Sequence, residues 1–319
     1  MRCTPGEMVM ENISMTAPEG TEKEIVAELP VFIVNPIAGA GLAEELFARA
    51  EKKLRALGMA YRVMRTERPG QASELAKQAI EDGARYIISV GGDGTLSEIS
   101  SAVCGQEDVK LGILPFGTGN DFAACVSIPT EPEEAAELIF RGTAKRTDLG
   151  SANGRIFTNV AGFGFDVDVL RSVEEHKGRG GRGMLPYVLG ILDAILHRKK
   201  IHCRVSIDGQ EQELDALIVT ACNGSRFGGG MIVAPEAVPD DGLFDICIAR
   251  WVGFFRLVTL LPKFIKGKHI GKKPVIYCRA KSLTVTTEGK FTVELDGELN
   301  ESTPLECRIL PGAMNIVRP

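Results

Sequence analysis

The sequence predicts an α/β domain with a parallel sheet, followed by an antiparallel β-sandwich domain. Between residues 29 and 148, short apolar runs alternate with runs of helical spacing, which is typical of βαβ units covered on both faces. Between residues 149 and 319, strand-like runs follow one another with turn residues between them. Residues 1–28 are polar without a clean period, and we expect them to form a flexible extension.

Each element of the first domain has a local signal. Strands are indicated by apolar or alternating runs. Helices are indicated by apolar residues three or four positions apart, with a glycine where the pattern ends. The predicted strands cover residues 29–36, 60–66, 84–90 and 110–116. The predicted helices cover residues 42–58, 71–83, 95–105 and 132–142.

The second domain reads mainly as β-structure. Residues 202–224 form two strand-like runs around Asp208 and Gly209, a dipeptide typical of a two-residue hairpin turn. Further strand-like runs cover residues 242–250, 274–280, 282–297 and 306–317. In the last third of the chain, only residues 254–267 clearly predict a helix.

Composition excludes several classes of protein. The net charge of −5 offers no global attraction to nucleic acid. The eight cysteines form no C-x-x-C pair, and without a secretory segment they indicate a reducing, cytoplasmic location. No apolar run reaches the ~18 residues of a membrane span. We therefore expect a soluble protein, or one that is peripheral at the inner face of the membrane.

Three predicted parallel strands end in turns rich in glycine and polar residues. The turns are "NPIAGAG" at residues 35–41, "GGDGT" at 91–95 and "FGTGND" at 116–121. Ligands bind at the carboxyl ends of strands in open α/β sheets, and glycine lets backbone amides approach an anion. The helix after "GGDGT" adds its positive N-terminal end, so the cluster predicts a phosphate site.

Asp93 adds a negative charge in the middle of this predicted phosphate site. Like charges repel, so Asp93 fits there if a divalent cation bridges the two, or if it takes a proton from a nucleophile. The structural alternative is a tight βα turn with an N-capping aspartate.

The three turns resemble the diacylglycerol kinase catalytic family, which includes bacterial soluble lipid kinases and sphingosine kinases. The resemblance continues through "APEAVPDDGLFDI" at residues 234–246 and "ELDGE" at 294–298. It implies a fold like that of diacylglycerol kinases and NAD kinases. It also implies that residues 29–148 bind ATP and that residues 149–319 bind the lipid.

The same resemblance implies a role for individual residues. The implied nucleotide contacts are Asn35, Pro36, Ile37, Ala38, Gly39, Thr66, Gly92, Asp93, Gly94, Thr95, Leu96, Ser97, Glu98 and Thr118. Asp93 and Asp121 are implied in the Mg²⁺ and water network around the phosphates. The "PDDG" turn resembles a structural Mg²⁺ site, with the Asp241 side chain and the carbonyls of Val238 and Leu243 as ligands.

Glu298 matches the family's general base, with Asp296 close by. A hydroxyl acceptor needs such a proton acceptor, whereas phosphoryl transfer otherwise needs positioning and charge neutralisation. Whether Asp93 or Glu298 takes the proton is left open by the sequence. The alternative for "LDGE" is an ordinary β-turn.

We therefore predict an ATP- and Mg²⁺-dependent lipid kinase whose acceptor is diacylglycerol and whose product is phosphatidic acid. The alternatives are a kinase of another acceptor, namely a sphingoid base, undecaprenol or NAD, and an inactive nucleotide-binding regulator. The family resemblance also leaves a homodimer open.

A membrane contact is a further hypothesis. The basic run at residues 177–183 precedes an apolar stretch that ends in Arg198, Lys199 and Lys200. Basic residues are attracted to anionic lipid by about 1 kcal/mol each. The alternative is a solvated loop followed by a buried helix.

Overall fold

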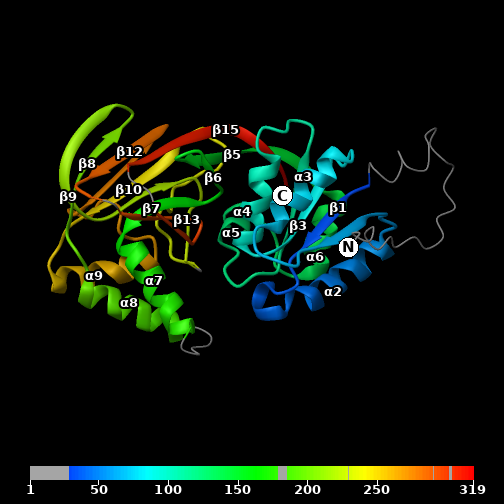
Figure 1. Cartoon of the computed structure of the whole chain (residues 1–319), viewed down its shortest axis with the longest axis horizontal. Helices are drawn as coiled ribbons and strands as arrows, with labels where there is room; N and C mark the ends of the chain where they lie inside the picture. Colours follow the sequence, from blue (N-terminus) through cyan, green and yellow to red (C-terminus); the bar gives the residue numbers. More distant parts are fainter. Residues whose placement is uncertain (1–28, 179–184, 229, 290, 302–303) are drawn as a thin grey trace. The chain divides into compact units, whose positions relative to one another are not determined.

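The computed structural model describes residues 29–178, 185–228, 230–289, 291–301 and 304–319, coloured in Figure 1. The predicted extension at residues 1–28, and Arg179 and Arg182 of the basic run, lie outside the described residues. The chain divides into two compact units. Of the described residues, unit 1 contains those up to Thr147 together with Gly312–Pro319, and unit 2 contains those between Asp148 and Pro311.

Unit 1 has the predicted alternation of strands and helices (Figure 1). Its strands are β1 (Val31–Val34), β2 (Arg62–Arg65), β3 (Tyr86–Gly91) and β4 (Lys110–Pro115). Its helical segments are η1 (Ala38–Gly41), α2 (Ala43–Ala56), α3 (Gln71–Glu81), α4 (Asp93–Val103), α5 (Asp121–Cys125) and α6 (Pro132–Arg141). The four strands pair in parallel, which the sequence predicts. Their order in the sheet, β4, β3, β1, β2, is given by the structure.

The core of unit 1 explains why its strands read as continuous apolar runs. All four residues of β1 are fully buried, because helices pack on the sheet. Phe32 lies among α2 residues such as Phe47, with their ring centroids 5.6 Å apart. Each fully buried large apolar side chain contributes about 1.5–3 kcal/mol relative to exposure.

Two strands pass from one unit to the other. They are β5 (Thr143–Ala152) and β15 (Leu305–Arg318). Asn315 and Ile316 of β15 pair in parallel with β4 of unit 1. The sequence assigned residues 312–319 to the second domain, whereas the structure places them in unit 1. This strand pairing spans about 200 positions along the chain, so no local pattern indicates it.

Unit 2 is built mainly from antiparallel strands. They are β6 (Arg155–Phe157), β7 (Val160–Gly164), β8 (Ile201–Ile207), β9 (Gln210–Cys222), β10 (Phe244–Arg250), β11 (Val275–Ala280), β12 (Ser282–Thr287), β13 (Thr292–Leu295) and β14 (Glu298–Glu301). The predicted hairpin joins β8 to β9: Ile207 pairs with Gln210, and Asp208 and Gly209 have φ of 47° and 83°. These positive angles are those of a type I′ turn.

Three helices belong to unit 2: α7 (Phe165–Gly178), α8 (Leu185–His197) and α9 (Phe254–Ile265). The sequence predicts α9, and it left α8 as the alternative of a buried helix. It did not predict α7. Strand β7 ends at Gly164, where φ is +116°, and α7 begins at the next residue, Phe165. Within the described residues, no helix is long and apolar enough to cross a membrane.

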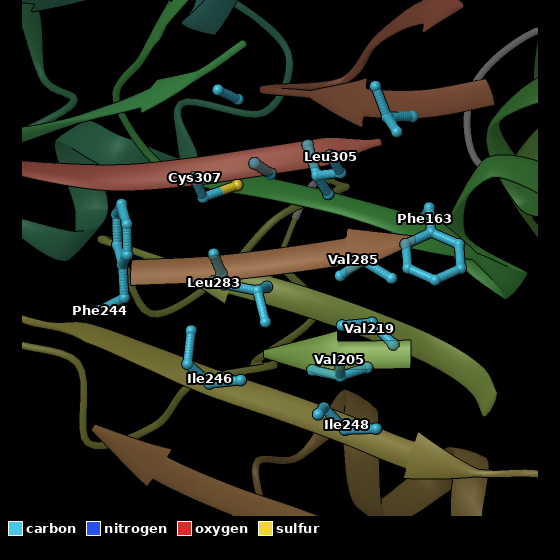
Figure 2. Packing of buried hydrophobic residues seen from close by; sticks show 14 of the residues in the cluster. Phe163, Val205, Val219, Phe244, Ile246, Ile248, Leu283, Val285, Leu305 and Cys307 are labelled. Atoms are coloured by element: carbon cyan, nitrogen blue, oxygen red, sulfur yellow. The ribbon is translucent and has the colours of Figure 1, made fainter. Parts of the chain in front are cut away.

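The β-sheet of unit 2 carries a different core on each face. Figure 2 shows one core, which contains Ile246 and Ile248 of β10 together with Leu283 and Val285 of β12. The other core contains alternate residues of the same strands, including Cys222 and Cys247, together with residues of α8 and α9. We call this second side the helix-covered face.

Candidate functional site

The turn after β1 is tied to the turn after β3. The backbone amide of Asn35 donates to the carbonyl of Val90 at 2.9 Å. Its side-chain amide donates to the hydroxyl of Thr95 at 3.0 Å, in the first turn of α4. Asn35 therefore fixes the first predicted nucleotide-binding turn against the "GGDGT" turn.

The glycines of the three turns allow backbone to pack on backbone. A Cβ on Gly39 would lie 2.5 Å from the carbonyl oxygen of Phe116, in the turn after β4. A Cβ on Gly92 would lie 3.1 Å from the Cα of Gly117, and a Cβ on Gly117 would overlap Gly92. Side chains at these positions would separate the turns, so glycine is required for the turns to meet.

The "FGTGND" turn places an acidic residue beside Asp93. Asn120 has φ of +55°, and its side chain bonds both the amide and the carbonyl of Gly117 at 3.0 Å. This closed turn starts α5 at the buried Asp121. The amide of the next residue, Phe122, donates to Oδ1 of Asp93 at 3.2 Å. The two predicted magnesium-network carboxylates therefore lie on adjoining elements of one site.

Glu98 has a structural partner that the sequence did not reveal. Its two carboxylate oxygens accept from the amides of Gly70 and Ala72, at 3.0 and 2.9 Å. These amides lie at the start of α3, where the helix dipole favours a negative charge. Glu98 thus anchors α3, and a nucleotide contact by Glu98 stays a prediction.

Thr66, another predicted nucleotide contact, lies directly after β2. Its backbone amide donates to the carbonyl oxygen of Val34 at 2.9 Å.

The other predicted nucleotide contacts differ in exposure. Leu96 is only 2% exposed and belongs to the buried side of α4, which indicates packing. Ile37 is 76% exposed and Thr118 is also exposed, so both are accessible to a ligand. Thr95 is buried as well, at 4% exposure. Among the other predicted contacts, Pro36, Ala38 and Ser97 are half-buried, and Gly94 is exposed.

In unit 2, "LDGE" forms a two-residue hairpin turn. Leu295 pairs with Glu298, and Asp296 and Gly297 between them have φ of 48° and 87°. The turn that the sequence left as an alternative is therefore present. Its geometry separates the two carboxylates, because Asp296 is in the turn and Glu298 begins β14.

Asp296 is a half-buried hydrogen-bond acceptor. Its Oδ2 accepts from the amide and the hydroxyl of Thr158, at 2.6 and 2.8 Å. Its Oδ1 accepts from the amides of Asn159 and Val160, at 2.8 and 3.0 Å. Burial raises the pKa of Asp296, and these hydrogen bonds oppose that rise. The carboxylate therefore positions the segment before β7.

Glu298 is accessible, with a side chain that is 57% exposed. Its Oε2 lies 3.6 Å from a guanidinium nitrogen of Arg155, which also bonds the side chain of Asn300. The exposed carboxylate is therefore accessible to a bound ligand. Of the two predicted residues in this hairpin, Glu298 is the more accessible one, and its role as a general base stays a prediction.

The "PDDG" turn is held by two acidic residues. Asp241 accepts from the amide of Leu243 at 3.0 Å and forms an ion pair with Arg279. Asp148, which is buried, accepts from the amide of Gly242 at 2.7 Å. The turn is therefore fixed by Asp241 together with Asp148 and Arg279, two side chains distant in the sequence.

Several buried polar side chains on the helix-covered face were missed in the sequence. Strand register places Glu294 beside Gly162 and Gly162 beside Thr220. A Cβ on Gly162 would lie 2.5 Å from Oδ2 of Asp166, so the glycine makes room for this carboxylate. Burial raises the pKa of Asp166 to about 7. The only local signal was acidic residues in an apolar run, "GFGFDVDV".

Two family models match consecutive parts of the chain. The diacylglycerol kinase catalytic domain matches residues 30–152, and the YegS C-terminal NAD kinase beta sandwich-like domain matches residues 159–318. The chain belongs to the diacylglycerol kinase catalytic family. It is accordingly a phosphotransferase with an alcohol acceptor, and membership in a kinase family implies a nucleotide substrate.

Individual relatives agree with this membership. A diacylglycerol kinase of Mycobacterium tuberculosis is 30% identical over 90% of this chain and 94% of its own length. A probable lipid kinase YegS-like of Pseudomonas aeruginosa is 32% identical over 88% of this chain and 91% of its own. Two crystal structures from Bacillus anthracis Sterne, named for a diacylglycerol kinase, match 92% of this chain with TM-scores of 0.76 and 0.69, at 27% and 25% identity.

The two Mg²⁺ sites implied for this kinase family lie in different settings. Mg²⁺ takes one or two carboxylates together with substrate phosphates and water. Asp93 and Asp121 offer carboxylates beside the glycine turns. At the "PDDG" turn, Asp241 forms an ion pair with Arg279, and a Mg²⁺ site there stays a prediction. The described residues contain no cluster of three or more His, Cys, Asp or Glu side chains suited to a metal.

Gly117→Ala tests the contact between the turns. The added methyl overlaps Gly92, so we expect a loss of about 1–3 kcal/mol in the free energy of unfolding and weaker nucleotide binding. Urea unfolding and calorimetric titration with ATP would measure both. Gly94→Ala is the stability control, because its methyl meets no atom within 4 Å. Equal stability of both variants and the wild type would contradict the close contact.

Asp166→Asn tests the buried carboxylate. A folded-state pKa of about 7, above the ordinary value of 3.8, stabilises the fold at low pH, and this contribution disappears as the pH rises through 7. The wild-type melting temperature should therefore fall more steeply between pH 4 and 7 than that of the variant. The exposed Glu211→Gln in β9 is the control. Parallel profiles for wild type and Asp166→Asn would contradict this assignment.

Proposed function

We propose that this kinase transfers the γ-phosphate of ATP to the hydroxyl of diacylglycerol and produces phosphatidic acid. The main support is the meeting of three glycine turns at the carboxyl ends of β1, β3 and β4, with Asp93 among them. The names of the relatives support the lipid acceptor, since they are diacylglycerol kinases and a lipid kinase.

The nucleotide phosphates would bind at the glycine turns of unit 1. The amides around Gly92 and Gly94 lie at the start of α4, where the helix end is positive. Gly39 and Gly117 keep the adjoining turns close, which leaves backbone rather than side chains at the surface of the site. Such a site orients the phosphates and neutralises their charge, and this accounts for much of the catalysis of phosphoryl transfer.

Magnesium would be held by Asp93 and Asp121. When bound, the ion neutralises negative charge on the phosphate oxygens. Its presence also explains an aspartate at the centre of an anion site. The amide of Phe122 orients Asp93 by its hydrogen bond, so the carboxylate is positioned before any ligand arrives.

Glu298 would accept the proton of the acceptor hydroxyl. It is exposed, whereas the oxygens of Asp296 are occupied by four hydrogen-bond donors. Asp93 is the other candidate, but its proposed role beside magnesium commits its negative charge to the cation. Because diacylglycerol resides in the bilayer, the proposal includes contact of the kinase with a membrane.

A transfer assay with labelled ATP tests both the acceptor and the base. Diacylglycerol, sphingosine, undecaprenol and NAD are offered separately, with and without Mg²⁺. We expect labelled phosphatidic acid only with Mg²⁺, and a loss of about 10²–10⁴-fold in turnover for Glu298→Gln with unchanged ATP binding. Asp93→Asn should weaken both turnover and Mg²⁺-dependent ATP binding.

Other outcomes contradict specific parts of the proposal. Label on another acceptor would overturn diacylglycerol as the substrate. Intact turnover in Glu298→Gln, with loss of turnover alone in Asp93→Asn, would exchange the two roles. ATP binding without transfer to any acceptor would favour the nucleotide-binding regulator.

A further inference from the structure

Helix α9 is apolar on two of its sides. Leu257, Leu260 and Phe264 are buried in the core beneath the helix. Phe255 is nevertheless 85% exposed, and Val258, one turn further on, is 45% exposed. One apolar side of α9 is therefore buried in the core of unit 2, and a second apolar side is in contact with solvent.

Contacts on its buried side anchor α9 to the body of unit 2. The ring of Phe264 stacks on that of His269 with centroids 3.8 Å apart, and Nε2 of His269 lies 2.9 Å from the carbonyl oxygen of Val233. His269 is fully buried, and burial lowers its pKa. The exposed side chains are thus presented on a helix that is anchored from below.

Helix α8 continues the apolar surface. Leu189, Leu192 and Leu196 lie three and four positions apart and are 38%, 52% and 69% exposed. Arg198, just after α8, places its guanidinium carbon 5.6 Å from the ring centroid of Phe254 at the start of α9. The end of α8 therefore lies beside the start of α9. We define the α8–α9 face by its exposed apolar residues: Leu189, Leu192, Leu196, Phe254, Phe255, Val258 and Ile265.

Positive charge lies along α9 and after α8, whereas α8 itself carries Asp193. The 42 residues from Ile246 to Thr287 contain nine Lys and Arg and no Asp or Glu, although the whole chain has a net charge of −5. Arg256, Lys263 and Lys266 repeat at helical spacing along α9 and its end, and they are exposed. They form a basic stripe beside the apolar one. Lys199 and Lys200 add positive charge after α8.

We propose that the α8–α9 face docks this kinase on an anionic lipid bilayer. A helix with exposed Phe and aliphatic residues on one side and Lys or Arg on another is suited to lie in the interface plane. The apolar side chains would enter the boundary between headgroups and acyl chains. The basic stripe would contact the phosphates of anionic lipids.

The charge of the face argues against a second copy of the chain as the occupant. Two such faces in a symmetric dimer would bring their basic stripes together, and like charges repel. An anionic bilayer instead complements both the apolar and the basic residues. The proposed function supplies only the reason for docking, which is access to a lipid acceptor. Binding to lipid itself is measured without nucleotide and without turnover.

Vesicle sedimentation tests the docking face. The full chain is mixed with vesicles of phosphatidylcholine alone, or of phosphatidylcholine with phosphatidylglycerol, at low and high salt. We expect binding to the anionic vesicles that weakens with salt. Phe255→Ser combined with Val258→Ser should weaken it at least about tenfold, because apolar burial is lost. Lys263→Gln combined with Lys266→Gln should weaken it roughly 30-fold.

Matched changes elsewhere serve as controls. Phe140→Ser alters a residue of α6 that is 42% exposed, and Lys52→Gln combined with Lys77→Gln removes exposed charges from α2 and α3. Both should leave vesicle binding unchanged. The α9 variants should also keep the wild-type rate with a short-chain, water-soluble diacylglycerol, while losing rate with diacylglycerol in vesicles.

Two results would overturn the proposal. The first is vesicle binding by the α9 variants that equals that of the wild type. The second is a wild-type dimer in light scattering that the Phe255→Ser and Val258→Ser changes dissociate without altering vesicle binding. Failure of the chain to phosphorylate any lipid would affect the proposed function alone, since vesicle binding is read without ATP.

Discussion

The close contact between backbone segments in unit 1 determines the candidate site. Gly92 and Gly117 pack without side chains between them, and Gly39 packs on the carbonyl of Phe116 in the same way. The parallel sheet brings the three turns to one edge, but only glycine lets them touch. Asn35 and Asp93 then fix the arrangement by hydrogen bonds to Thr95 and Phe122. The backbone amides, helix ends and carboxylates of the candidate site all take their positions from this contact.

The sequence predicts those parts of the structure that depend on neighbouring residues. Apolar runs followed by glycine turns indicate the parallel sheet and the three turns. Asp208–Gly209 indicates a hairpin because Asp and Gly readily adopt the positive φ that its turn requires. The sequence did not reveal that Asp296 holds residues 158–160, or that Glu98 anchors α3, because these partners are distant in the chain. For the same reason it missed the parallel pairing of residues 315 and 316 with β4.

Unit 2 contains carboxylates removed from solvent and apolar side chains exposed to it, and both are unfavourable for folding. Burying a carboxylate costs free energy unless it is protonated or hydrogen-bonded. Four hydrogen-bond donors stabilise the carboxylate of Asp296. Burial of Asp166 instead raises its pKa to about 7, which favours the protonated form. On the surface of unit 2, α9 exposes Phe255 beside a basic stripe. Under the proposed function, Glu298 would serve proton transfer and the α8–α9 face would serve access to lipid.

Hydrogen–deuterium exchange with and without Mg²⁺ and ATP tests most directly whether the three turns form the nucleotide site. Bound phosphates should slow exchange of the backbone amides in residues 35–41, 91–98 and 116–122 together, because amides of all three turns face one ligand. Exchange in the β8–β9 hairpin around Asp208 should not change. Protection confined to one turn, or located outside unit 1, would contradict the assignment of these turns as a single nucleotide site.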